Sequence, residues 1–283
     1  MSRFRDLIFP LSQHQFLRNL SQRKLAFYPN KIGPGINELI NFNSIFEIIK
    51  AGKLPVGITS VTKNQTPILQ FMYSKDSYLE PDKIEKIINS GGSLILDPAQ
   101  EQFPNLKDIC DDLTLVTQEK VNAAVIITTG NGGAFPPHTD AMDLIIIQVE
   151  GSKQWKIYDP PISHPYVAKQ KAKRQNFDEF LQYGSLIFDE EIQRRDFLFV
   201  PAGYWHHCEN RSDRSIHVAL AIDPPTAFSV ITELLKDYLR EDPFCLPLSR
   251  IDDREEKDKF ISKITCELAE KFKNIVYGSE QAP

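Results

Sequence analysis

The sequence predicts an α+β protein that is mainly β, with a closed or sandwiched antiparallel structure in the middle and helices at both ends. Apolar runs of strand length succeed one another from Val121 to Ile222, and turn-forming Gly, Pro, Asn and Asp residues separate them. No helical pattern stands between most of these runs, which argues against a parallel βαβ sheet. We therefore expect a helical N-terminal layer, a β core around residues 93–223 and a helical C-terminal appendage.

Helices and short strands alternate in the predicted N-terminal layer. Apolar residues at helical spacing predict a helix over residues 11–27, which ends before Pro29. Pro81 suits the first turn of a later helix, and the Gly91-Gly92 pair suits its end. The other elements expected before the β core are helices at Asn41–Ile49 and Pro81–Asn89 and strands at Val56–Val61 and Pro67–Tyr73.

The β core is predicted to begin with one strand, Ser93–Leu96, and one helix, Asn105–Val116. Short apolar runs bounded by turn residues then follow without a further helix. The strands expected in this part are Ala123–Thr128, Leu144–Val149, Gln154–Tyr158, Ser185–Phe188, Phe197–Val200 and Ile216–Ile222.

The pattern returns to helix after Pro224-Pro225 and ends in a frayed tail from Gly278. We therefore expect one domain over residues 1–225 and a helical segment over residues 226–283. Apolar positions in this segment suit either packing within the chain or a homodimer interface, and their periodicity does not choose between the two. The helices expected there are Phe228–Arg240 and Lys257–Phe272.

Composition narrows the classes of protein. A chain of 283 residues can bury a sizeable core, and 41% apolar with 25% charged residues is ordinary for a globular protein rather than a disordered one. The net charge of −5 argues against nucleic acid as a direct ligand. The N-terminus lacks a signal-peptide core, and no run approaches the ~18 apolar residues of a membrane span.

The cysteines indicate a reducing compartment. They are widely scattered and include no C-x-x-C pair, so they predict neither a disulfide framework nor a thiolate zinc site. We therefore expect a cytoplasmic protein. The four cysteines are Cys110, Cys208, Cys245 and Cys266.

Three residues form a candidate metal site. His138 and Asp140 form an H-x-D pair, whose side chains point to the same side of an extended segment. His206 follows the apolar run Phe197–Val200, and a barrel can bring such separated strands together. Two imidazoles and one carboxylate on one face of a metal leave the opposite face open, as in non-haem Fe(II) oxygenases. A bare H-x-D pair is common, and its residues can equally cap a turn or pack in a core. The assignment of a metal site therefore depends on the flanking sequence.

The flanking segments resemble those of one family. Pro136–Asp140, Glu150–Lys156, Arg195–His206 and Ser215–Val218 are similar to the motifs of JmjC-type 2-oxoglutarate oxygenases. The similarity is greatest to the cupin-like ribosomal-oxygenase branch, whose members hydroxylate side chains of ribosomal proteins. It covers roughly residues 93–223. The resemblance implies a double-stranded β-helix (jelly-roll or cupin) core and a catalytic centre that uses Fe(II) and 2-oxoglutarate.

The resemblance also implies a role for each site residue. His138, Asp140 and His206 would bind the iron; His206 is chosen over His207 because the family's ligand follows a Gly and two bulky residues. Lys153 would pair with the distal carboxylate of 2-oxoglutarate, whose other end chelates the metal. A charge-assisted bond is strong in a partly dry pocket, although an exposed lysine beside a turn is the commoner case.

Two positions depart from the family pattern. Related oxygenases often have a tyrosine where this chain has Ile126, and a Ser or Thr where it has Ala219. Both changes remove a hydroxyl donor expected near 2-oxoglutarate. Thr128 lies on the same strand face as Ile126 and could bind the cosubstrate instead. His217 is expected either to face the pocket or to be a satisfied core histidine.

The function that the resemblance implies is a 2-oxoglutarate-dependent dioxygenase that hydroxylates a side chain in a protein or peptide, with a ribosomal protein as one candidate. A second hypothesis is hydroxylation of a free amino acid or of a natural-product precursor peptide. It is supported by the C-terminal segment: longer family members have a winged-helix region after the barrel, and the 58 residues after Pro225 are too few for a full one. A demethylase is a third reading. A non-oxidative metal-binding cupin is the alternative from another class, which the departures at Ile126 and Ala219 favour mildly.

Overall fold

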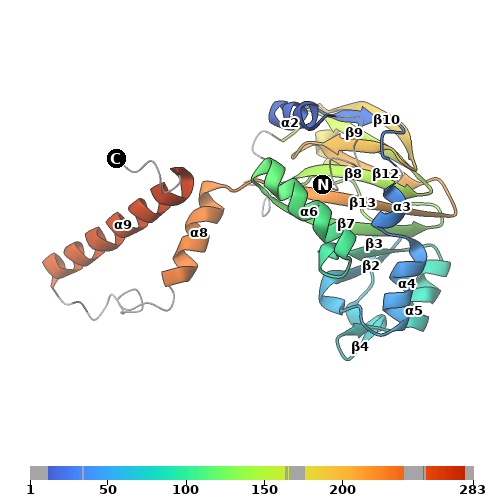
Figure 1. Ribbon diagram of the computed structural model, residues 1–283, viewed down its shortest axis with the longest axis horizontal. Coiled ribbons are helices and arrows are strands. Elements are labelled where there is room, and N and C mark those ends of the chain that lie inside the picture. The colour runs from blue at the N-terminus through green and yellow to red at the C-terminus, as the bar shows by residue number, and fades with distance from the viewer. Residues whose placement is uncertain are drawn as a thin grey trace. The chain divides into compact units, whose positions relative to one another are not determined.

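The computed structural model describes residues 12–33, 35–162, 165, 176–238, 251 and 253–277. These residues belong to two compact units, one that ends at Pro224 and one that begins at Pro225 (Figure 1). The first unit contains the sheets and the candidate site. The second contains two helices, α8 (Ala227–Tyr238) and α9 (Arg254–Tyr277). No helix in the described part of the chain is both long enough and apolar enough to cross a membrane.

Two antiparallel sheets form the centre of the first unit (Figure 1). The chain passes from one sheet to the other between β8 and β9 and again at each step from β10 to β13, which is the winding of a jelly roll. The predicted double-stranded β-helix core is confirmed. The larger sheet has the order β1 (Ala26–Tyr28), β11 (Phe197–Val200), β8 (Asp143–Glu150), β13 (Arg214–Asp223), β7 (Lys120–Thr129), β6 (Gly92–Leu96), β2 (Thr59–Lys63), β3 (Thr66–Pro67). The smaller sheet has the order β10 (Ser185–Gln193), β9 (Ser152–Asp159), β12 (Trp205–Asn210).

Helices of the N-terminal layer cover the outer face of the larger sheet. Their buried apolar side chains belong to one cluster with alternate residues of β7, β8 and β13. Local sequence sets their ends: the Asn41 side chain accepts a hydrogen bond from the Ser44 amide at the start of α4, and Pro81 begins α5. The helices of this unit are α2 (Gln13–Gln22), α3 (Ile36–Leu39), α4 (Phe42–Lys50), α5 (Pro81–Asn89), α6 (Pro104–Thr117) and α7 (Phe177–Phe180).

The central strands are buried on both faces, which explains their continuous apolar runs. In β8, Ile145 and Ile147 belong to the outer cluster, whereas Leu144 and Ile146 belong to a second cluster between the two sheets. Successive side chains of a strand point to opposite faces, so each central strand serves both layers. The inner cluster surrounds the candidate site described below.

Three expectations about local structure were wrong. The helix expected over residues 11–27 ends at Gln22, because Arg23 takes a left-handed conformation and Ala26–Tyr28 pair with β11 as strand β1. The strand expected at Pro67–Tyr73 is reduced to Thr66–Pro67, and Gln70–Met72 form a 3₁₀ turn. Strand β12, which carries His206, was not expected, since its sequence is mostly polar.

The remaining differences lie at element ends. Val56–Ile58 form a 3₁₀ turn ahead of β2 where a strand was expected. The predicted end of the helix at Arg240 and the tail from Gly278 lie outside the described residues. Three short elements remain in the described part of the first unit: the two-stranded ribbon β4 (Ser74–Lys75) and β5 (Tyr78–Leu79), and a 3₁₀ turn at Ala99–Glu101.

Candidate active site

Backbone pairing places the two site histidines side by side. His138 lies in the connection between β7 and β8 and forms an isolated antiparallel bridge with His206 on β12. The His138 amide donates to the His206 carbonyl at 3.1 Å, and the His206 amide donates to the His138 carbonyl at 2.9 Å. Residues that exchange both hydrogen bonds have Cα atoms about 5.5 Å apart and side chains on the same face. Residues 68 positions apart in the chain thus become neighbours.

The turn before β12 holds Asp140 beside this pair. Gly203 donates its amide proton to the Asp140 carbonyl at 2.9 Å, and the Asp143 carboxylate accepts from the Ala202 amide at 2.6 Å. Gly203 has a φ of 89°, and a Cβ there would lie 3.1 Å from the carbonyl oxygen of Ile162, so both conformation and space require glycine. Asp143 therefore serves the geometry of the loop.

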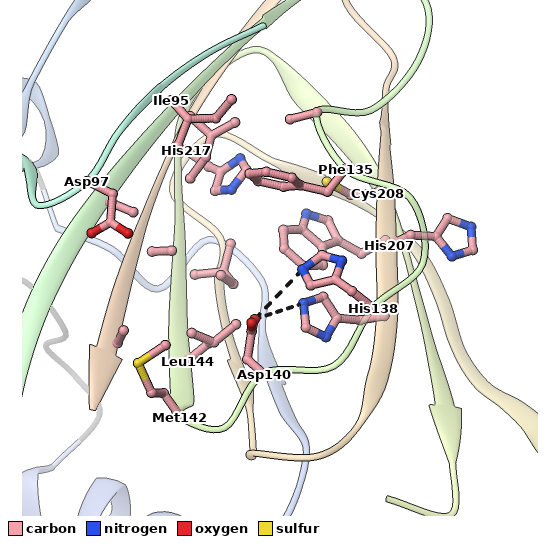
Figure 2. Close-up of a pocket in the computed structure, with 18 of the residues that line it drawn as sticks. Ile95, Asp97, Phe135, His138, Asp140, Met142, Leu144, His207, Cys208 and His217 are labelled. Carbon is pink, nitrogen blue, oxygen red and sulfur yellow. Dashed lines mark ion pairs between the residues drawn. The ribbon is translucent and has the colours of Figure 1, made fainter. Parts of the chain in front are cut away.

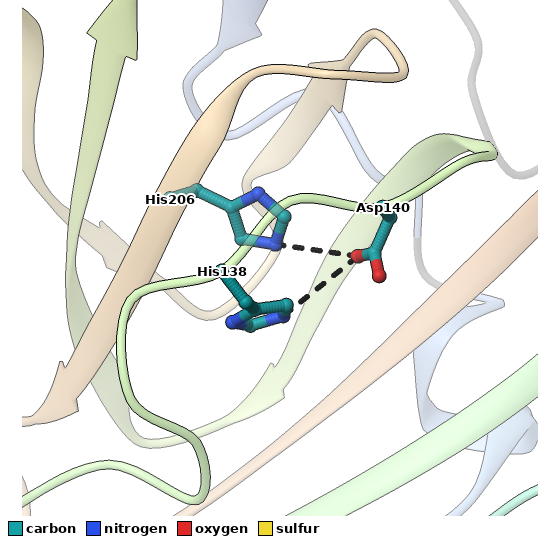
Figure 3. Close-up of side chains that lie close together, drawn as sticks. All are labelled: His138, Asp140 and His206. Carbon is teal, nitrogen blue, oxygen red and sulfur yellow. Dashed lines mark ion pairs between the residues drawn. The ribbon is translucent and has the colours of Figure 1, made fainter. Parts of the chain in front are cut away.

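The three side chains converge on one point (Figure 3). Oδ2 of Asp140 lies 3.4 Å from Nε2 of His206 and 3.8 Å from Nε2 of His138. One ligand atom from each residue lies within 4.8 Å of the other two. Nitrogen and carboxylate ligands bind a divalent metal such as zinc at about 2.0–2.2 Å, so donors with these separations can reach a common ion with small side-chain movements.

Hydrogen bonds set both imidazoles in the form that binds metals. Nδ1 of His138 lies 2.8 Å from the carbonyl oxygen of Pro136, and Nδ1 of His206 lies 3.0 Å from that of Tyr204. Because a carbonyl oxygen can only accept, each Nδ1 carries the proton. Each Nε2 therefore lies on the side of the ring that faces Asp140, where its lone pair can bind a metal ion once one is present, as in metal sites whose histidines are oriented by an outer hydrogen bond.

The electrostatics of the three residues favour a bound cation. Burial and the neighbouring His206 lower the pKa of His138 to about 4, so its imidazole is neutral at pH 7. Burial alone would raise the pKa of Asp140, but the hydrogen bond and charge interaction with His206 hold it below its ordinary value. Burial would likewise lower the pKa of His206, and Asp140 raises it instead. A carboxylate and a neutral imidazole are thus ready to bind a metal.

A cavity of about 320 Å³ opens beside the triad, between the two sheets (Figure 2). Its walls are mostly apolar, with a few converging polar groups, which is the usual character of a small-molecule site. Besides His138, Asp140 and His206, its lining consists of Ile95, Asp97, Asn122, Ala124, Ile126, Ala134, Phe135, Met142, Leu144, Ile146, Trp155, His207, Cys208, His217, Ala219 and Ala221.

Lys153 lies behind the lining of this cavity, near the lining residues His217 and Cys208. The side chain comes from β9 and is fully buried, and its Nζ donates to the Thr128 hydroxyl at 3.0 Å. Among the described residues, no carboxylate lies within ion-pair distance of it, and burial lowers its pKa. Burying an unpaired ammonium is costly, so this region beside the cavity is suited to an anion. Neither Lys153 nor Thr128 borders the open volume itself.

Polar atoms without partners surround this lysine. Ser93 donates to the Thr128 hydroxyl at 3.2 Å, and Ser215 lies directly opposite Thr128 in the β7–β13 register. The Ser215 hydroxyl, Nδ1 of His217 and Nε1 of Trp155 are buried without a hydrogen-bond partner among the described residues. Because buried polar groups normally find partners, these atoms fit a polar ligand with several acceptor atoms.

The departures at Ile126 and Ala219 can now be placed. Both side chains line the cavity: Ile126 lies two residues along β7 from Thr128, and Ala219 lies four residues along β13 from Ser215. Thr128 and Ser215 themselves lie outside the cavity lining, and the Thr128 hydroxyl contacts Lys153. The sequence predicted a cosubstrate role for Thr128 but not for Ser93 or Ser215. The only sequence feature that could have indicated these two serines is their position on the inner face of their strands.

Two further histidines, His207 and His217, also border the cavity. His217 lies on β13 at the cavity wall, where burial holds its pKa well below the ordinary value, so the ring is neutral. His207 points away from the triad (Figure 2) and stacks on Tyr158 with ring centroids 5.8 Å apart. Asp97 is a cavity residue that the sequence reading missed, because nothing in its local sequence separates it from an ordinary residue at a strand end.

Comparison with known proteins agrees with this geometry. Residues 96–230 match the JmjC domain family. The chain is 26% identical over 231 residues to the bifunctional lysine-specific demethylase and histidyl-hydroxylase NO66 of Drosophila sechellia, and the match covers 81% of this chain and 35% of that protein. It is 26% identical over 214 residues to the NO66 protein of Brugia malayi, covering 75% and 29%. The chain thus spans about a third of the length of these relatives.

Solved structures of the same fold include the Escherichia coli ribosomal oxygenase YcfD, with a TM-score of 0.60 and 14% identity, covering 91% of this chain and 66% of that one. A YcfD complex with cobalt and 2-oxoglutarate superposes with a TM-score of 0.58 and 14% identity, covering 92% and 67%. The matched family model includes His138, Asp140 and His206 within its range. Residues 96–230 of this chain therefore match a JmjC domain, and its fold is similar to that of the E. coli ribosomal oxygenase.

Proposed function

We propose that this protein is an Fe(II)- and 2-oxoglutarate-dependent oxygenase that hydroxylates a side chain of a protein or peptide. The observation that carries the proposal is the arrangement of two Nε2 atoms and one carboxylate beside a cavity, together with a buried lysine without an ion-pair partner behind the cavity wall. Such a triad leaves metal positions open for a second ligand and for oxygen. The lysine supplies the charge that a dicarboxylate requires.

His138, Asp140 and His206 would hold the metal. Their donor set of two neutral imidazoles and one carboxylate suits Fe(II), and the proton on each Nδ1 keeps both Nε2 atoms available. When bound, the iron supplies the oxygen chemistry, in which 2-oxoglutarate, O2 and a C–H bond become succinate, CO2 and a C–OH group. One oxygen atom enters succinate and the other enters the substrate.

Lys153 would orient the cosubstrate. Its ammonium would pair with the distal carboxylate, and the Thr128 hydroxyl, which accepts from Lys153, would hold the ammonium in place. The partnerless atoms of Ser215, His217 and Trp155 could donate to the same carboxylate. Because Lys153 does not border the open volume, binding requires the lining near His217 and Cys208 to adjust.

The substrate is proposed to be a ribosomal protein. The fold likeness to a ribosomal oxygenase and the sequence likeness to a histidyl-hydroxylase support a protein substrate, with ribosomal proteins as the first candidates. The free thiols of Cys110, Cys208 and Cys266 support a location in the reducing cytoplasm. Mass spectrometry of ribosomal proteins from cells with and without the gene would show a mass gain of one oxygen atom on the substrate.

We also propose that residues 226–283 contribute to a homodimer. Phe228, Ile231 and Leu235 follow a helical spacing on α8 and are 78%, 43% and 44% exposed, respectively. Apolar side chains exposed along one helix face are common at subunit interfaces. Light scattering after gel filtration would test this, with Phe228→Ser expected to shift a dimer to monomer; a monomeric wild-type protein would contradict the proposal.

Two measurements test the enzymatic proposal. Anaerobic addition of Fe(II) and then 2-oxoglutarate should produce the weak visible charge-transfer band of the chelate. Addition of oxygen should then convert 2-oxoglutarate to succinate, slowly without substrate and faster with it. Absence of both the band and the turnover would identify a non-oxidative metal-binding cupin instead.

A further inference from the structure

Strand β10 forms an open edge of the smaller sheet. It pairs with β9 on one side, and no other described strand pairs with its other side. Residues of an antiparallel strand direct their backbone N–H and C=O groups alternately to one side and to the other, so every second residue of β10 directs these groups away from β9. The described residues supply no backbone hydrogen bond to these groups between Ser185 and Ile192. Such an edge is a template to which another extended chain can add.

Apolar side chains are exposed at the beginning of this edge. Leu186 and Ile187 are 47% and 45% exposed, and Tyr183, just before the strand, is 70% exposed. A bulge lies at Ile187, and the register with β9 is then regular from Phe188 to Gln193. An added strand can therefore pair along this regular part and contact the apolar side chains beside it.

The charge of this edge is entirely negative. The segment from Asn176 to Gln193, which contains α7 and β10, has five carboxylates and no lysine, arginine or histidine. Among the described residues, no lysine or arginine lies within ion-pair distance of the three carboxylates of β10, not even Lys156, which is opposite Asp189 in the register. The five carboxylates are Asp178, Glu179, Asp189, Glu190 and Glu191.

These carboxylates favour a basic partner over a second copy of the chain. Opposite charges on neighbouring strands stabilise their pairing, and like charges opposite each other destabilise it. If β10 paired antiparallel with its own copy about Glu190, Asp189 would lie opposite Glu191 and each Glu190 opposite the other. A strand that carries lysine or arginine would instead neutralise these side chains, so the same charges that disfavour self-pairing select a cationic partner.

We propose that β10 binds an extended basic segment of a partner protein, in which lysine or arginine alternates with apolar residues, as a fourth strand of the smaller sheet. The backbone of this segment would pair with the free edge and its cations with the carboxylates, while its apolar side chains would contact Leu186 and Ile187. No residue of β10 lines the cavity, so the inference does not depend on the proposed oxygenase function.

Peptide binding at physiological salt concentration tests this inference. The probe is a fluorescein-labelled peptide of alternating lysine and valine that is as long as β10, and its binding is measured by anisotropy. We expect it to bind about tenfold tighter than the same peptide with glutamate in place of lysine. Methylation of its backbone nitrogens keeps the charge but removes the donors of strand pairing, so it should weaken binding by about the same factor. Hydrogen–deuterium exchange should slow in residues 185–193 when the unmethylated peptide is bound.

Charge reversal in β10 should remove the preference for the basic peptide. Glu190→Lys with Glu191→Lys should bind the lysine and glutamate peptides equally, and Glu190→Gln with Glu191→Gln should lie between this variant and the wild type. Glu47→Lys with Glu85→Lys is the matched control, because it makes the same change in charge at exposed residues of α4 and α5 and should keep the full preference.

Equal binding of the methylated and unmethylated peptides would overturn the inference, as would slowed exchange that does not include β10. A preference that survives charge reversal in β10 would also overturn it. Slow exchange in β10 without peptide that is lost on dilution would identify a second copy of the chain as the occupant, which contradicts the proposal.

Discussion

The two faces of the larger sheet use the same strands for different purposes. On the outer face, Val125, Ile127 and Val218 pack in a continuous apolar layer with the helices. On the inner face, the intervening positions include Thr128 and His217, which are polar and buried. The outer layer stabilises the fold because its apolar area is removed from water. The inner layer stabilises the fold less, because it buries polar side chains whose hydrogen bonds only a ligand would complete. Along each central strand, therefore, alternate residues stabilise the fold on the outer face and form the candidate site on the inner face.

The largest effect should follow from removing a proposed metal ligand, which β12 of the smaller sheet directs toward the cavity. In His206→Ala, iron-dependent turnover should fall to background, because the proposed metal site loses one of its three protein ligands. The β12 backbone pairing should persist, so circular dichroism should be unchanged. Iron binding by calorimetry and 2-oxoglutarate turnover are the measurements. His207→Ala is the control and should retain turnover; activity in His206→Ala would remove His206 from the ligand set.

An outer-face truncation should affect stability instead of chemistry. Ile147→Ala removes a fully buried side chain from the outer cluster and should lower the free energy of unfolding by about 2–5 kcal/mol. The concentration of 2-oxoglutarate for half-maximal activity should stay within about twofold of wild type. Ile146→Ala, the neighbour that faces the cavity, should change that concentration. If both variants changed it equally, the separation of the two faces would be refuted.

Lys153→Met tests the role of the lysine behind the cavity wall. The half-maximal 2-oxoglutarate concentration should rise by about tenfold or more, since a charge-assisted bond is lost, while the iron requirement stays the same. Methionine roughly conserves the buried volume, so a packing defect is avoided. Titration of turnover with each ligand separates the two requirements. An unchanged 2-oxoglutarate curve would mean that another residue holds the carboxylate.

The same variant should change how stability depends on pH. Burial lowers the pKa of Lys153 below its ordinary value of 10.5, so between the two values the unfolded chain binds a proton that the folded chain does not. The free energy of unfolding therefore rises with pH in that window for the wild-type protein without ligand. The difference between wild-type and Lys153→Met denaturation curves should show this rise. A difference that is flat up to pH 10 would contradict the burial of an unpaired lysine.

The smallest effect should come from the hydroxyl that positions the lysine. Thr128→Val keeps the shape of the side chain but removes the acceptor for Lys153 Nζ, at a cost of about 1 kcal/mol. We expect a rise of about fivefold in the half-maximal 2-oxoglutarate concentration. Ser44→Ala, on the surface at the start of α4, is the control and should leave that concentration unchanged. No change in Thr128→Val would assign the positioning of Lys153 to other groups.

Local pattern determined much of this protein. Strands such as β11 and helices such as α5 have the bounds that apolar runs and Pro81 predict, because burial and chain stiffness act over a few residues. The H-x-D pair was likewise visible in the sequence, and the resemblance to the family pointed to Lys153, whose burial only the tertiary structure shows. Tertiary structure alone decided that polar β12 is a strand, that Ala26–Tyr28 leave the helix to pair with β11, and that Asp97 faces the cavity. These features depend on hydrogen bonds and packing between segments far apart in the chain, which no local propensity encodes.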